Sequence, residues 1–139
     1  MSSPGEYLLD AQNKRPHIKA IGEDVPIRKF ETGATRDTDN GKFDYEGFLS
    51  PAVIRRYAQF MHFHRKQRDG SLRSSDNWQK GIDKDVYMKS LLRHVMDAWL
   101  VNRGQEPTDP TGLQDILCAI IFNAMGMLYE EMGLRSGNN

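Results

Sequence analysis

Three side chains on two predicted helices are placed to form a single chemical site. His94 and Asp97 lie three residues apart, which puts them on the same face of a helix predicted over 83–103. Asp115 lies on a second helix, predicted to begin between 109 and 111 and to run to 132. If a short turn near residue 106 joins the two helices, antiparallel pairing brings Asp97 and Asp115 to the same height.

Two aspartates at one level of a helical bundle suit a hard divalent cation. Mg²⁺ or Mn²⁺ takes one or two carboxylates together with phosphate oxygens of a substrate. The competing interpretation is structural: the His94–Asp97 pair only stabilises its helix, and Arg93 forms an ordinary surface ion pair with Asp97. Spacing alone leaves both interpretations open.

Asn123 is a further candidate because it lies within the apolar segment 116–128. An amide buried there without a partner would cost about 1–3 kcal/mol. The side chain therefore needs a partner, which is either another group of the protein or a ligand.

Basic and imidazole residues gather between positions 55 and 73, a clustering that suits phosphate. The alternative is a solvated helix face whose charge is balanced by nearby aspartates. His62 and His64 are two residues apart, so on a helix they would diverge by about 200° and could not hold one zinc ion. The members of this cluster are Arg55, Arg56, His62, His64, Arg65, Lys66, Arg68 and Arg73.

Helical periodicity predicts three elements that would position these residues. Ser50 followed by Pro51 is typical of a helix start, and apolar residues at helical spacing continue to about 66. A long loop around Trp78 follows over 68–83, and Gly104 and Gly133 end the next two helices. Residues 31–49 are rich in turn formers and indicate an ordered loop.

These elements predict an all-α fold, a small antiparallel helical bundle with long ordered loops. No segment has the alternation of a convincing strand. Residues 1–30 carry three prolines and no sustained period, so we expect an extended N-terminal arm there and a single domain over 31–139.

Composition narrows the class of protein. The chain has 139 residues, 19 basic and 19 acidic side chains and one cysteine, so it cannot form an internal disulfide, and its formal net charge of zero disfavours nucleic acid as a partner. The longest apolar run, 116–122, is short for a membrane helix, and the N-terminus lacks the pattern of a signal peptide. We expect a cytoplasmic protein without a membrane partner.

Several segments together resemble a phage-associated family. They include Gly33-Ala34-Thr35-Arg36-Asp37, the pair Gly41-Lys42, Asn77-Trp78-Gln79-Lys80-Gly81 and Arg93-His94. The resemblance spans about 30–132 and is to the dATP/dGTP diphosphohydrolases of N-terminal type, which are similar to MazG-like nucleotide pyrophosphohydrolases. It implies a metal-dependent enzyme that cleaves a purine deoxynucleoside triphosphate to the monophosphate and pyrophosphate, in the cytoplasm of the phage's host.

The resemblance also implies roles for individual residues. Asp97 and Asp115 would hold Mg²⁺ or Mn²⁺, and His94 or a nearby carboxylate would act as the base. Family members of this shape are oligomers, so we expect at least a homodimer. The residues predicted to bind the substrate are Arg36, Lys42 and Lys80 at the phosphates, Trp78 stacked on the base, and Asn123.

A different class of function is compatible with the same residues. MazG-like enzymes bind metal through a Glu-Glu-x-x-Glu cluster, which this chain lacks. The alternative is a non-catalytic phage module that binds a nucleotide or a host protein through the loops at 31–49 and around Trp78.

Overall fold

The computed structural model describes residues 26–135, and the chain divides into two compact units, 1–44 and 45–139. The predicted N-terminal arm over 1–30 therefore lies largely outside the described residues.

The described part of the first unit is a small β-hairpin. Strands β1 (Ile27–Lys29) and β2 (Thr35–Asp37) pair antiparallel, with Arg28 opposite Arg36. Between them Gly33 adopts a positive φ of 87°, which closes the turn at little steric cost. The all-α prediction is wrong for this segment, and the remaining fold is mostly helical. Strands of three residues are too short to show the alternation by which a strand is recognised.

The second unit begins with two helices in succession, α2 (Tyr45–Phe48) and α3 (Pro51–Phe63). The predicted start of α3 is confirmed, because the Ser50 side chain accepts a hydrogen bond from the Val53 amide and proline occupies the first turn. The helix ends three residues before the predicted position. Beyond it the chain turns back on itself, with a bridge between Lys66 and Leu72. The short α2 corrects the prediction of a continuous loop over 31–49.

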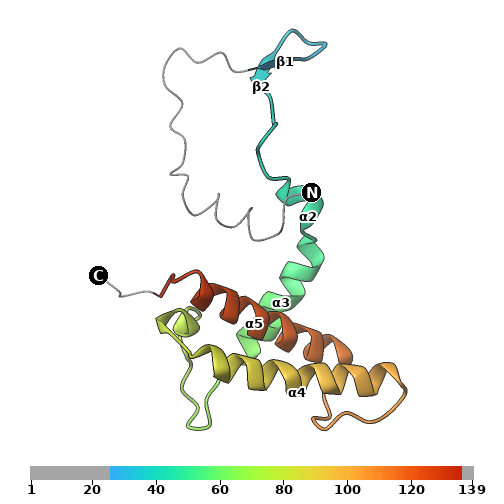
Figure 1. The fold of residues 1–139 in the computed structure, drawn as a ribbon, viewed down its shortest axis with the longest axis vertical. Coiled ribbons are helices and arrows are strands. Elements are labelled where there is room, and N and C mark those ends of the chain that lie inside the picture. The colour runs from blue at the N-terminus through green and yellow to red at the C-terminus, as the bar shows by residue number, and fades with distance from the viewer. Residues whose placement is uncertain (1–25, 136–139) are drawn as a thin grey trace. The chain divides into compact units, whose positions relative to one another are not determined.

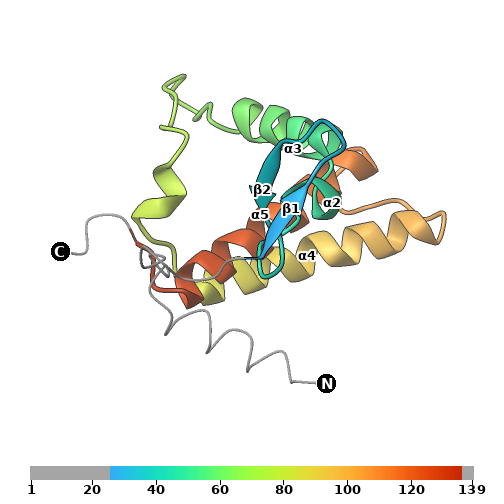
Figure 2. The same cartoon turned by 90° about the horizontal axis from the view of Figure 1, so that it is seen from above.

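Helices α4 (Lys84–Asn102) and α5 (Leu113–Glu131) form the body of the second unit. They lie side by side and antiparallel, as predicted (Figures 1 and 2). Their connection over 103–112 is longer than the predicted turn, and α5 begins later, after Gly112. A short 3₁₀ helix, η1 (Asn77–Lys80), contacts α5 and carries Trp78.

The core lies where α3 and α4 pack on α5. Phe60 of α3 is buried with Cys118 and Ala119 of α5, and Tyr87 of α4 is almost fully buried. Gly126 of α5 lies directly against the Tyr87 ring, so the absence of a side chain there allows the two helices to approach closely.

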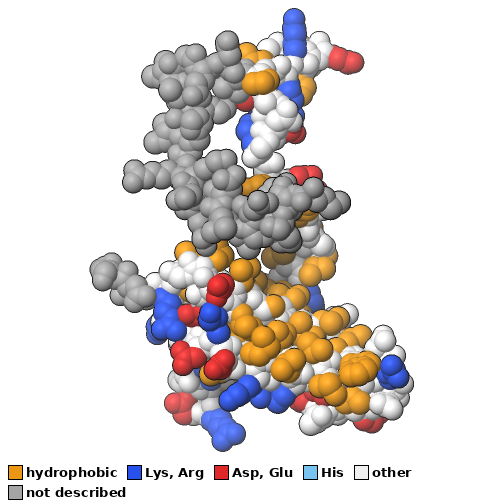
Figure 3. Space-filling view, viewed as in Figure 1, with side chains coloured by type: hydrophobic (Ala, Val, Ile, Leu, Met, Phe, Trp, Pro, Cys, Tyr) orange, Lys and Arg blue, Asp and Glu red, His pale blue; other side chains and the backbone are white. Residues whose placement is uncertain are grey.

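On the opposite side of the α4–α5 pair, many apolar side chains are not covered by other described residues. Figure 3 shows hydrophobic side chains gathered over both helices on the face turned away from α3. By length and composition alone, α5 would also be able to cross a membrane, a test that the core helix of a soluble protein passes equally.

Candidate functional site

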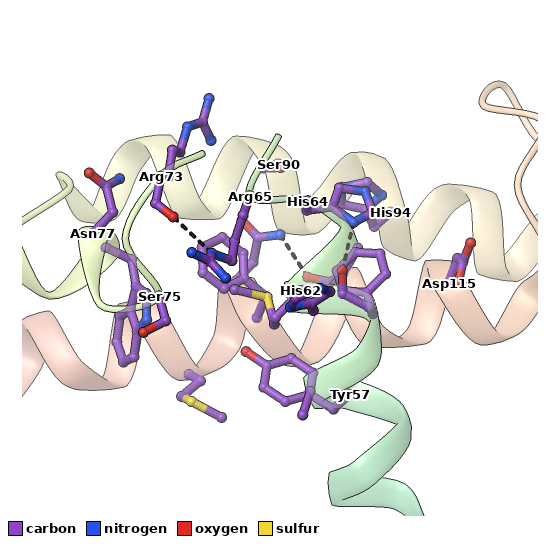
Figure 4. A pocket seen from close by; sticks show the side chains of 18 of the residues that line it. Tyr57, His62, His64, Arg65, Arg73, Ser75, Asn77, Ser90, His94 and Asp115 are labelled. Carbon is purple, nitrogen blue, oxygen red and sulfur yellow. Dashed lines mark hydrogen bonds between the residues drawn. The ribbon is translucent and has the colours of Figure 1, made fainter. Parts of the chain in front are cut away.

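A cavity of about 770 Å³ lies within the second unit, between α3, the loop that carries η1, and the inner faces of α4 and α5 (Figure 4). Its walls include aromatic, basic and acidic side chains beside aliphatic and neutral polar ones. The aromatic members are Tyr57, Phe60, Trp78 and Phe122, the basic and imidazole members are Arg65, Arg73, His62, His64 and His94, and the acidic members are Asp109 and Asp115.

Helical spacing explains how these residues reach one space. On α5 the lining positions include Asp115, Ala119 and Phe122, which recur at intervals of three and four residues and so share a face. On α4 the same spacing brings Ser90 and His94 to the cavity. The cavity therefore follows from the amphipathic faces that form the core.

One wall of the cavity is an aromatic cluster around Trp78. Its indole meets Phe122 edge to face, with ring centroids 6.4 Å apart, and lies 4.9 Å from the ring of Tyr129. Such edge-to-face contacts are favourable arrangements for aromatic rings and fix the indole in place. Trp78, predicted to stack on a base, is thus part of a preformed apolar wall. Lys80 follows it on η1 but is exposed and is not among the residues lining the cavity.

Apart from His94 on α4, the basic and imidazole members come from the end of α3 and the loop after it. The Arg65 Nε donates to the Arg73 carbonyl at 2.9 Å, and the Arg73 amide donates to the Arg65 carbonyl at 2.9 Å, so the two residues hold each other at the cavity. His64 Nδ1 lies 2.9 Å from the Phe60 carbonyl. Close to them, burial raises the pKa of Tyr57, which keeps its hydroxyl protonated as a donor.

Both His62 and His64 line this cavity. His64 is the residue that caps α3, and its amide donates to the Phe60 carbonyl. The basic cluster at 55–73 was the sequence signal for this part of the site. It could not indicate which members face inward.

Asp115, predicted to hold a metal ion, lines the cavity but already has a basic partner. Its Oδ1 accepts from Arg56 Nη2 at 2.5 Å, and Arg56 Nε donates to Gln114 Oε1 at 2.9 Å. The pair is partly exposed, with 34% and 40% of the two side chains accessible. Its charge is therefore balanced within the protein before any ligand binds.

Asp97 has a structural role that the sequence did not reveal. Its carboxylate is buried and accepts hydrogen bonds from the backbone amides of Thr108 at 2.7 Å and Asp109 at 3.3 Å. These bonds, that of Thr108 foremost, lower the pKa of Asp97. The side chain fastens the α4–α5 connection, and it is not among the residues lining the cavity.

Asn123 is buried on α5 and lines the cavity. Its Nδ2 donates to the Ala119 carbonyl at 2.7 Å, so a structural partner accounts for part of its hydrogen-bonding capacity.

The predicted trio of His94, Asp97 and Asp115 does not come together: within residues 26–135, no group of three His, Cys, Asp or Glu side chains could hold a metal ion. Arg36 and Lys42 belong to the first unit.

Comparison of the chain with protein-family models, curated proteins and solved structures gave no match. The resemblance to dATP/dGTP diphosphohydrolases and the activity it implies therefore stay predictions.

Proposed function

We propose that the protein binds a nucleotide, of the purine deoxynucleoside triphosphate class that the sequence resemblance implies, in the cavity between α3, α4 and α5. The observation that carries the proposal is the joining of aromatic and basic side chains in one space of about 770 Å³. Ligand pockets of small molecules span roughly 300–1,000 Å³, with mostly apolar walls and a few placed polar groups.

The two kinds of wall match the two parts of a nucleotide. A base is planar and apolar on its faces, and Trp78 with Phe122 presents ring surface for it. Phosphate oxygens are acceptors with negative charge, and Arg65, Arg73 and His64 are among the residues that line the cavity. A sugar–phosphate ligand would in this arrangement lie along the end of α3.

Pyrophosphohydrolase activity is the second proposal, and a specific observation favours it. His94 and Asp115 line the same cavity as the arginines, so a bound triphosphate would have an imidazole and a carboxylate within its walls. The two aspartates predicted to hold Mg²⁺ or Mn²⁺ do not complete a site for the ion. Asp115 is paired with Arg56, and Asp97 accepts hydrogen bonds from backbone amides. Binding is therefore the function that the geometry supports best.

The test is a panel of deoxy- and ribonucleoside triphosphates with the purified full chain, in the presence of Mg²⁺, of Mn²⁺ and of EDTA. Isothermal titration calorimetry measures binding, and monophosphate and pyrophosphate are followed separately. Saturable one-to-one binding supports the first proposal, and metal-dependent pyrophosphate release supports the second. Absence of binding to every nucleotide contradicts both.

A matched pair of arginine variants locates the phosphate contact. Arg65→Met removes a guanidinium that lines the cavity, whereas Arg68→Met removes one that is exposed and outside it. A hydrogen bond to a charged group contributes about 1.5–3 kcal/mol, so Arg65→Met is expected to weaken binding by about tenfold or more. Arg68→Met should leave it unchanged. Equal effects of the two variants would mean that binding is non-specific attraction to surface charge. Circular dichroism checks that Arg65→Met, which loses its bond to Arg73, remains folded.

A further inference from the structure

The loop between α3 and α4 forms one wall of the cavity and is fastened separately at its two ends. Its first part is closed by the bonds that Arg65 and Arg73 make to each other's carbonyl groups. Its last part, residues 77–83, contains η1 and contributes Trp78 and Ile82 to the cavity. The contacts that hold this last part therefore set where the aromatic wall lies.

Glu130, near the end of α5, bonds to this last part of the loop with one carboxylate oxygen and to Arg135 with the other. Its Oε1 accepts from the Ile82 amide at 3.1 Å, and its Oε2 accepts from Arg135 Nε at 2.7 Å. The Glu130 side chain is only 6% exposed. A buried charge is tolerated where it is paired and hydrogen-bonded, so these two partners fix the orientation of the carboxylate. Neither Glu130 nor Arg135 is among the residues that line the cavity.

Arg135 lies directly against the loop at Gly81. A Cβ atom built at Gly81 would lie 2.7 Å from Arg135 Nε, so the close approach of the guanidinium depends on the absence of a side chain there. The same guanidinium pairs with Asp83, at 3.5 Å between Nη2 and Oδ1. The end of α5 and the residues after it thus contact the loop at three consecutive positions, Gly81, Ile82 and Asp83.

We propose that Glu130 is a positioning residue for the aromatic wall, and that nucleotide affinity depends on it although it does not line the cavity. This inference rests on the proposed function and names what holds that site ready. With the Ile82 amide fastened to α5, Trp78 stays against the rings of Phe122 and Tyr129. A wall that is ordered before binding removes the cost of ordering it when the ligand arrives, which raises affinity.

The neighbouring glutamate provides a matched control for a purely structural role. Glu131 also pairs with a basic side chain at the end of α5, since Lys84 Nζ lies 2.6 Å from its Oε2. Its partner belongs to α4, and the Glu131 side chain is 68% exposed. A general effect of charge at this helix end would therefore appear on removal of either glutamate, whereas an effect through the loop requires Glu130.

The test compares Glu130→Ala with Glu131→Ala in the full chain, in a Trp99→Phe background that leaves Trp78 as the only tryptophan. Without ligand, Glu130→Ala should make the Trp78 emission more accessible to quenching by acrylamide and should speed hydrogen exchange at the Ile82 amide. Isothermal titration calorimetry should show the affinity for dATP lowered by about fivefold or more, because a loosened wall loses part of the base stacking. Glu131→Ala should match its parent in all three measurements.

Two further variants separate positioning from loss of the fold, which circular dichroism monitors. Glu130→Gln keeps an oxygen that can accept from the Ile82 amide and should retain most of the affinity, whereas Arg135→Met removes the other partner of the carboxylate and should weaken binding.

The positioning role is overturned if Glu130→Ala leaves the quenching of Trp78 and the exchange of the Ile82 amide unchanged, or if Glu131→Ala alters them equally. A loosened wall with unchanged dATP affinity overturns the link to binding. Absence of dATP binding by the wild-type chain overturns the proposed function together with that link, and the two measurements without ligand then judge the positioning role by itself.

Discussion

Replacement of Gly126 by alanine tests how the helices that frame the cavity are held together. A Cβ atom built at Gly126 would overlap the ring of Tyr87 and lie 2.7 Å from its hydroxyl oxygen, well inside the roughly 3.5–4.0 Å at which non-bonded atoms attract. The ring has little room to move, since Tyr87 is 2% exposed and packs against Phe122. The helices would have to separate or the ring change its rotamer.

Two opposing effects set the size of the change. Overpacking by one methyl group costs about 1–3 kcal/mol, whereas alanine gains about 1 kcal/mol over glycine within a helix. We expect Gly126→Ala to lower the free energy of unfolding by up to about 2 kcal/mol. The measurement is urea denaturation followed by circular dichroism at one fixed protein concentration, with the slope m as a check on the two-state assumption.

The double variant gives the decisive comparison. In a Tyr87→Leu background the ring is gone, so adding the Gly126→Ala change should stabilise the protein by up to about 1 kcal/mol. The effect of the alanine thus reverses sign between the two backgrounds, which measures the coupling of residues 87 and 126 directly. If Gly126→Ala stabilises the wild-type chain, or has the same effect in both backgrounds, the close approach of α4 and α5 is not set by this contact.

Three other predictions follow from buried polar groups. Asp97→Asn should lower the melting temperature and speed hydrogen exchange at the Thr108 amide, measured by NMR; unchanged exchange would mean that this carboxylate does not fasten the connection. The hydrogen bond from Arg135 is the largest cause that holds the pKa of Glu130 below its usual value. The ionised Glu130 carboxylate therefore stabilises the fold above about pH 4.5, and this contribution is lost as pH falls through the lowered pKa. Glu130→Gln should therefore show a weaker loss of stability than wild type between neutral pH and acid, and an identical profile would refute this. Burial raises the pKa of the Cys118 thiol, so a thiol reagent should react with it only on unfolding, and rapid reaction with native protein would contradict its placement.

Local signals accounted for most of the helical fold. Ser50 and Pro51 marked the start of α3 because they satisfy the end of a helix by local chemistry. Gly104 and Gly133 follow the ends of α4 and α5 with positive φ, a conformation open to glycine at little cost. The β-hairpin had no comparable signal, because its strands have three residues each and depend on pairing across a turn.

The site was harder to predict because it depends on which partner each polar group finds. His94 and Asp115 reach the cavity because helical spacing fixes their faces. Asp97 was wrongly grouped with them: the prediction assumed a short turn, whereas the longer connection places two backbone amides over its carboxylate. Arg65 and His64 required knowledge of where α3 ends, which depends on the tertiary path of the loop that follows.

Photo-cross-linking with a photoreactive azido derivative of dATP tests the central claim most directly. The full chain is irradiated with the nucleotide, with and without excess dATP as competitor, and the labelled peptides are identified by mass spectrometry. Binding in the cavity predicts competed label within 54–82 or 115–125, the segments that supply most of its walls. Competed label confined to 26–44, the segment of Arg36 and Lys42, or label that excess dATP does not reduce, would contradict it.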